Sequence, residues 1–222
     1  MSTTLLVIHI GAGSIAVFAL LLAFAARKGE SWHRRAGRIY SHSMAAALVA
    51  ALLLALLTTN WMLLAVAVFS AYLVYSGWRC AALRESNLLG IDKIALLLML
   101  ITAAAMFALA YTMLAGGDQM GVTVAVFAAI GGGFALRDGL RWQTGWPNGK
   151  DRLILHLTRM CGASIATLTA VVVVNVQTEP AYIAWLAPTV VFVPVIVYWT
   201  RRVRAGRLAP ARKEAAADKI SA

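Results

Sequence analysis

Residues 4–38 read TLLVIHIGAGSIAVFALLLAFAARKGESWHRRAGR. The first part, residues 4–26, contains no Lys, Arg, Asp or Glu and is long enough to cross a bilayer, because about 20 apolar residues span the hydrocarbon core as a helix. Basic residues follow this run and none precedes it, which is the reverse of the order in a cleaved signal peptide. The stretch therefore predicts a retained membrane-spanning helix whose N-terminus faces outward.

The composition of the whole chain agrees with a membrane protein. The chain has 222 residues, of which 61% are hydrophobic and 13% charged, and its mean hydropathy is +0.78. These values lie far from those of soluble domains. The length allows about seven or eight spans and leaves no room for a separate soluble domain.

Seven apolar runs alternate with short polar connections along the chain. The predicted spans are residues 4–26, 39–58, 61–78, 93–114, 121–136, 153–176 and 182–200. All 20 Lys and Arg residues lie in four stretches, at or close to alternate connections and at the C-terminal end. Basic residues mark the cytoplasmic side of a membrane protein. The pattern predicts an all-α integral membrane protein with seven transmembrane helices, its N-terminus outside and its C-terminus cytoplasmic. Residues 1–200 form the transmembrane domain, and 201–222 a tail that is basic and then mixed in charge.

The formal net charge of +11 does not indicate nucleic-acid binding in this chain. The basic residues flank the spans, where anionic lipid headgroups attract them. We therefore expect the lipid bilayer and anionic headgroups as partners and no nucleic acid. A second membrane protein or a second copy of the chain is a further candidate partner. Cys80 and Cys161 lie toward the basic, reducing side, which disfavours a disulfide.

Two kinds of membrane protein are disfavoured by what the predicted spans contain. No Asp or Glu lies in the middle of a predicted span, whereas transporters driven by protons or sodium commonly use intramembrane carboxylates. The last predicted span also contains no Lys, which excludes a retinal Schiff base there.

The clearest candidate site involves two histidines on different spans. His42 and His156 each lie about one helical turn from the basic side, so their depths match. Arg38 and Arg159 share a helix face with these histidines. Two imidazoles at equal depth are what a bis-histidine haem b requires, and the arginines could pair with its propionates.

Other interpretations of these residues stay open. With His33 added, the same groups could form a three-histidine site for a divalent metal with an open position for water. His and Arg near span ends also commonly reach the headgroups without binding a cofactor. His9 lies alone near the outer end of the first span.

Further polar and small residues lie close to this region or within the spans. Tyr72, Tyr75 and Ser76 place hydroxyls near the basic end of the third span, where they could join the histidines or belong to an interfacial aromatic belt. Three consecutive glycines at 131–133 favour close helix packing over a ligand-binding break in the helix.

Four segments carry a resemblance to a known family. They are His9-Ile10-Gly11-Ala12-Gly13, His33-Arg34-Arg35-Ala36-Gly37-Arg38, Gly77-Trp78-Arg79, and the stretch from His156 through Arg159, Met160 and Gly162. In this order they resemble the bacterial predicted-membrane-protein family called domain of unknown function twenty-three-zero-six. The resemblance implies a multi-helix protein of the bacterial cytoplasmic (inner) membrane and brings no established reaction. It points to these positions for testing: His9, His33, Arg34, Gly37, Arg38, Trp78, His156 and Arg159.

Three functional hypotheses follow from the sequence. The first is a multi-pass protein that binds one haem or metal ion near the cytoplasmic face through histidines. The second is a small permease or lipid-handling protein whose basic mouth is built around Arg38 and Arg159. The third is a subunit that packs in a membrane complex. Whether the protein is an enzyme is not predicted.

Overall fold

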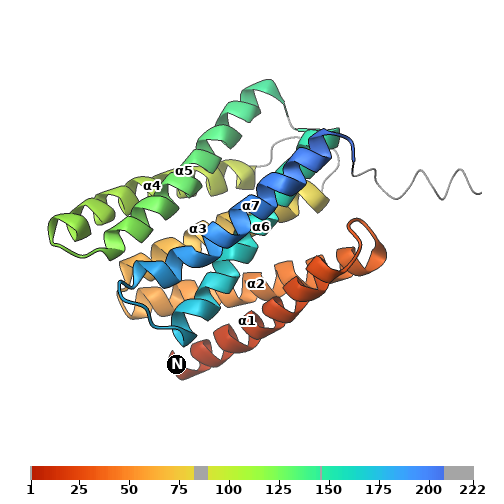
Figure 1. Ribbon diagram of the computed structural model, residues 1–222. Coiled ribbons are helices and arrows are strands. Elements are labelled where there is room, and N and C mark those ends of the chain that lie inside the picture. Colours follow the sequence, from red (N-terminus) through yellow and green to blue (C-terminus); the bar gives the residue numbers. More distant parts are fainter. Residues whose placement is uncertain (1, 83–89, 146, 208–222) are drawn as a thin grey trace, which may run out of the picture.

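A computed structural model describes residues 2–82, 90–145 and 147–207, and within these ranges it contains seven α-helices and no strand (Figure 1). The prediction of an all-helical, seven-span protein is confirmed. The helices are α1 (Ser2–Ala25), α2 (Ser31–Leu57), α3 (Trp61–Ala82), α4 (Gly90–Ala115), α5 (Met120–Thr144), α6 (Gly149–Asn175) and α7 (Tyr182–Arg204).

The outer surface of the helices is apolar. All seven helices are long and apolar enough to cross a membrane. Large side chains such as Phe18 (70% exposed), Val190 (71%) and Val174 (81%) point away from the protein. A water-soluble monomer rarely exposes extended apolar surface of this kind, whereas lipid tails accommodate it. The protein is a multi-pass membrane protein.

Helix α3 lies at the centre of the arrangement. It contacts α2, α4, α5 and α6, while α1 packs on α2 and α7 packs mainly on α6. Helices α4 and α5 pack chiefly on each other and form a unit at one side, which we call the α4–α5 hairpin (Figure 1). We call the end where α1, α3, α5 and α7 finish and α2, α4 and α6 begin the basic end.

Polar residues form the turns at the opposite end. The Asn60 side chain accepts a hydrogen bond from the amide of Leu63 (3.0 Å), and that of Asp118 accepts one from Met120 (2.8 Å). Such side chains satisfy amide groups that a helix start leaves without an intrahelical partner. They explain why α3 and α5 begin where they do.

The glycines of α5 allow the hairpin to pack closely. Helix α5 continues through residues 131–133 without a break. A Cβ atom at Gly131 would lie 2.5 Å from Cε of Met99 and 2.8 Å from Cδ2 of Phe69. The Phe69 ring also stacks on that of Phe127, with centroids 5.2 Å apart. The geometry supports the packing interpretation of these glycines.

Helix boundaries at the basic end differ from the predicted spans. The apolar pattern predicts that the fifth span ends at 136 and that residues 137–152 form a long connection, but α5 continues to Thr144 and α6 begins at Gly149. Helix α4 likewise begins at Gly90, and residues 201–204 belong to α7. The predicted tail from 208 on lies outside the described residues. Apolarity marks the lipid-facing length, while these helices continue with charged side chains.

Candidate functional site

The α4–α5 hairpin carries two aspartates near the basic end. Asp92 lies in the first turn of α4 and is 6% exposed, and Asp138 lies near the end of α5 and is 15% exposed. A helix N-terminus favours negative charge, whereas a helix C-terminus disfavours it. The apolar pattern places both carboxylates outside the predicted spans. The structure adds that both lie within helices long and apolar enough to cross a membrane.

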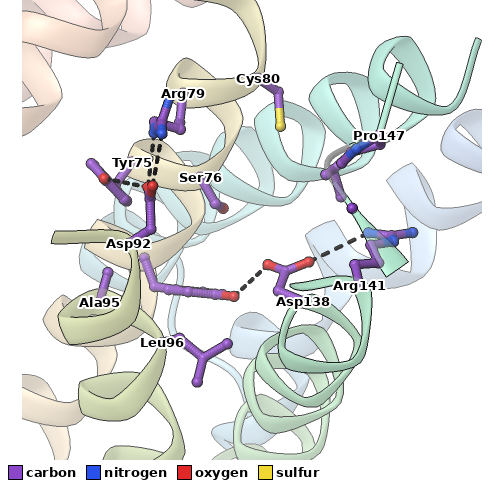
Figure 2. A pocket seen from close by; sticks show the side chains of 13 residues that line it. Tyr75, Ser76, Arg79, Cys80, Asp92, Ala95, Leu96, Asp138, Arg141 and Pro147 are labelled. Atoms are coloured by element: carbon purple, nitrogen blue, oxygen red, sulfur yellow. Dashed lines mark hydrogen bonds and ion pairs between the residues drawn. The ribbon is translucent and has the colours of Figure 1, made fainter. Parts of the chain in front are cut away.

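Asp92 forms a two-point ion pair with Arg79 of α3. The arginine Nε donates to Oδ1 (2.8 Å) and Nη2 donates to Oδ2 (2.7 Å), so the planar guanidinium matches both carboxylate oxygens (Figure 2). The hydroxyl of Tyr75 donates to Oδ1 at 2.6 Å. With Arg79 only 2% exposed, this pair is buried on both sides.

Asp138 receives donors from three side chains. Nη2 of Arg159 on α6 donates to both carboxylate oxygens at 2.8 Å, and the hydroxyl of Tyr72 on α3 donates to Oδ2 at 2.5 Å. Nη1 of Arg141, one turn along α5, lies 3.4 Å from Oδ1. Arg159 is 1% exposed, whereas Arg141 is 35% exposed. Solvent therefore reaches this second pair from the basic end.

The buried guanidinium of Arg159 lies against aromatic rings. Its centre is 4.0 Å from the ring centroid of Phe134 and 5.4 Å from that of Tyr72, distances at which a cation is attracted to a ring face. The carbonyl of Phe134 accepts a further hydrogen bond from Nη2 (3.3 Å). Within the described part of the chain, Nε and Nη1 have no hydrogen-bond partner. These two nitrogens of Arg159 can therefore donate to a further acceptor.

A pocket lies between the two ion pairs, and we call it the polar pocket because most of the side chains named below are polar. Both aspartates, Arg79, Arg141, the two tyrosines, Ser76 and Cys80 are among its lining residues (Figure 2). Its volume is ≈ 40 Å³, enough for a few water molecules, since one water occupies roughly 10–15 Å³ on this measure. Tyr72, Tyr75 and Arg79 are spaced as i, i+3 and i+7, so one face of α3 supplies donors to both aspartates.

Gly77 brings α3 and α6 close together beside this pocket. A Cβ atom there would lie 2.6 Å from Sδ of Met160 and 3.1 Å from Cβ of Arg159. Nδ1 of His156 donates to the Gly77 carbonyl at 2.9 Å. Two of the segments that carry the family resemblance therefore meet at this crossing, although Trp78 itself points outward and is 38% exposed.

The structure does not bring His42 and His156 together. His42 is exposed, and its Nδ1 donates to the Arg38 carbonyl of its own helix at 2.7 Å. Tyr40 faces α6, because its hydroxyl lies 3.0 Å from that of Thr167. Two residues correspond to about 200° around a helix, so His42 lies on the far side of α2 from α6. The matched depth of the two histidines is not accompanied by a shared face.

The other histidines bridge neighbouring helices. His33 donates from Nδ1 to the Ala23 carbonyl (3.0 Å), and His9 donates to that of Ala47 (2.9 Å). His33 also lies within electrostatic range of His156. Among residues 2–82, 90–145 and 147–207, no three His, Cys, Asp or Glu side chains gather in a group that could hold a metal ion. Haem or metal binding stays a prediction, testable by absorption spectroscopy and metal analysis of the purified protein.

The connection between α1 and α2 has its own polar contacts. Nζ of Lys28 donates to the carbonyls of Phe24 (2.8 Å) and Ala23 (3.0 Å), where α1 ends. Burial lowers the pKa of this ammonium group. Arg34 is exposed and donates to the Gly29 carbonyl at 2.5 Å, and Arg38 is exposed as well. These arginines lie at the surface, away from the polar pocket.

The site residues missed by sequence reasoning are Arg79, Asp92, Asp138 and Arg141. Arg79 reads as an ordinary loop arginine at the end of a span, but it is buried. Tyr75 is a predicted candidate, yet it contacts Asp92 and not a histidine. The spacing of Tyr72, Tyr75 and Arg79 on one face of α3 was the available signal, since buried polar side chains need partners.

No known family model, curated protein or solved structure matches this chain. The resemblance to the family named above stays a prediction.

Proposed function

We propose that the protein is a small permease that binds an oxyanion, a carboxylate or a phosphate, between Arg159 of α6 and Tyr72 of α3. One observation carries this proposal: donors from α3, α5 and α6 converge on a single carboxylate. Arginine and tyrosine side chains can donate to any oxyanion of suitable shape, and arginine is the preferred residue for planar recognition of carboxylate and phosphate. In this closed form, Asp138 occupies the position that a substrate oxyanion would take.

The division of charges suggests how the site opens. Both aspartates lie on the α4–α5 hairpin, and the buried arginines paired with them, Arg79 and Arg159, lie on α3 and α6. A rigid-body movement of the hairpin would separate each carboxylate from its guanidinium, as in domain-like rocking motions. Two turns along α4 from Asp92, Met99 is fully buried. A substrate would replace Asp138 while the hairpin moves.

The orientation and membrane are part of the same proposal. The distribution of basic residues supports a cytoplasmic location of the basic end, and the family resemblance supports a bacterial inner membrane. The polar pocket would then face the cytoplasm in the closed form. The mouth differs from the one the sequence predicts, because Arg38 is exposed on α2 and the pocket is lined by Arg79 and Arg141.

A thermal-shift screen tests binding. The detergent-purified protein is heated with acetate, lactate, glutamate, phosphate or sulfate, with chloride at equal ionic strength as reference. We expect at least one oxyanion to raise the unfolding temperature of wild type and of Arg38→Gln, the matched surface variant. Arg159→Gln and the milder Tyr72→Phe should lose this shift. If no oxyanion exceeds chloride, or if both pocket variants keep the shift, the binding site is not there.

Uptake into proteoliposomes tests transport. Vesicles containing the protein are given the radiolabelled oxyanion found in the screen, with empty vesicles as control. We expect protein-dependent uptake that Tyr72→Phe reduces and Arg38→Gln leaves intact. Binding without any uptake would contradict the permease and leave only a binding protein.

A further inference from the structure

The last turns of α7 change from apolar to basic along one face. Val197 and Tyr198 each lie three or four residues from Pro194 and from Arg201, and Ala205 follows Arg201 by four residues at the C-cap, which places these residues along one face. Together with Arg202 and Arg207 they line a groove of ≈ 480 Å³, which we call the α7 groove. The groove is apolar toward the membrane interior and cationic at the basic end.

The arginines at the basic end of the α7 groove form no ion pair within the described ranges. This holds for Arg201, Arg202, Arg204 and Arg207. The ammonium group of Lys150 adds a fifth charge, since its Nζ lies 3.4 Å from the Arg204 carbonyl. The polar pocket, in contrast, contains two ion pairs between arginine and aspartate.

The orientation of Arg202 is partly fixed by aromatic neighbours. Its Nη1 donates to the Tyr198 hydroxyl at 2.8 Å, and its guanidinium lies 5.6 Å from the Tyr198 ring and 5.8 Å from that of Trp199. Tyr and Trp are the residues that lie at headgroup depth in membranes. The charges of the groove are therefore held where lipid phosphates are found.

From this arrangement we infer that the α7 groove binds an anionic phospholipid, with the phosphate against Arg201, Arg202 and Arg207 and an acyl chain along Val197 and Pro194. A soluble anion would use only the cationic part. A phospholipid matches both parts, because its apolar chain and its charged headgroup follow in the same order as the groove. Basic pockets beside membrane helices bind anionic headgroups by the same chemistry.

Native mass spectrometry of the full-length protein tests this site. The protein is released from detergent after addition of phosphatidylglycerol or phosphatidylcholine, and retained lipids are counted over a lipid titration. The groove variant carries Arg201→Gln, Arg202→Gln and Arg207→Gln. The matched control carries Arg34→Gln, Arg35→Gln and Arg38→Gln, which remove the same charge from exposed positions on α2 at the same end. A third variant, Val197→Phe, fills the apolar part and keeps every charge.

We expect wild type to retain phosphatidylglycerol over phosphatidylcholine. The groove variant should bind the first phosphatidylglycerol roughly 100-fold more weakly, because each arginine at the surface contributes about fivefold. The control should lose much less, and Val197→Phe should weaken binding without changing the charge. Equal losses in the groove variant and the control would show a diffuse charge effect and overturn the site. Displacement of the lipid by inorganic phosphate at matched ionic strength, or full binding in Val197→Phe, would overturn the acyl-chain part.

Discussion

The two buried ion pairs join the α4–α5 hairpin to different helices, α3 and α6, and they are built differently. Arg79 meets Asp92 through two nitrogens, and both residues are at most 6% exposed. Arg159 meets Asp138 through one nitrogen, and that carboxylate is 15% exposed and shared with Arg141 and Tyr72. The Arg79–Asp92 pair has the bidentate geometry, with two parallel hydrogen bonds, which is the stronger arrangement. The second leaves donors available for another acceptor.

The difference assigns distinct roles to the two pairs. Breaking a buried pair by removing one partner is costly, because the remaining charge stays buried. That penalty is greatest for Asp92, which is 6% exposed, and smaller for Asp138, which is 15% exposed and keeps a second arginine, Arg141. We interpret the Arg79–Asp92 pair as the attachment of the hairpin and the Arg159–Asp138 pair as the exchangeable contact.

The largest expected effect is the loss of Arg79. Arg79→Ala should lower the free energy of unfolding by about 3–5 kcal/mol, because it leaves the Asp92 carboxylate buried without its guanidinium. Arg159→Ala should cost less, since Tyr72 and Arg141 still donate to Asp138. Titration with SDS in mixed micelles measures both values. A greater loss for Arg159→Ala would reverse the assignment of the two pairs.

The two tyrosines separate stability from binding. Tyr75→Phe and Tyr72→Phe should each lower the unfolding free energy by about 1.5–3 kcal/mol, as expected for a hydrogen bond to a charged group. Only Tyr72→Phe should weaken oxyanion binding, because only its hydroxyl contacts the Asp138 carboxylate. Equal loss of binding in both variants would show that the pairs do not act separately.

The crossing of α3 and α6 tests how Arg159 is positioned. Gly77→Ala should cost about 1–3 kcal/mol through overpacking, because the new methyl group would meet Met160 and Cβ of Arg159. It should also reduce oxyanion binding. Gly133→Ala is the control, since nothing lies within 4 Å of its Cβ position, and it should keep or slightly raise stability. An unchanged unfolding transition in Gly77→Ala would contradict this packing.

The smallest expected effects concern the histidines. His156→Ala removes the hydrogen bond to the Gly77 carbonyl and should cost about 0.5–1.5 kcal/mol. His42→Ala should leave stability unchanged, because His42 is exposed and bonds only within its own helix. Differential scanning fluorimetry compares the two. A haem-containing preparation whose colour depends on both residues would instead support the bis-histidine hypothesis and require α2 to turn.

The seven helices could be predicted because each has a long apolar run, and lipid contact depends on apolarity alone. The ends of α4 and α5 could not, since Asp92 and Asp138 look like connection residues until their partners are known. Those partners lie 13 and 21 residues away along the chain, on other helices. For His42 the prediction failed for a different reason. Its depth could be derived from helix rise, but its direction depends on how α2 packs against α6.

The most direct test of the exchangeable contact compares Asp138→Asn with Asp92→Asn. Isothermal titration measures the affinity of each purified variant for the oxyanion identified in the thermal-shift screen. Removing the internal anion should tighten binding in Asp138→Asn by roughly tenfold, which corresponds to about 1.4 kcal/mol, and Asp92→Asn should bind as wild type does. Unchanged or weaker binding in a folded Asp138→Asn protein, or tighter binding in Asp92→Asn, would contradict the assignment of Asp138 as the occupant of a substrate site.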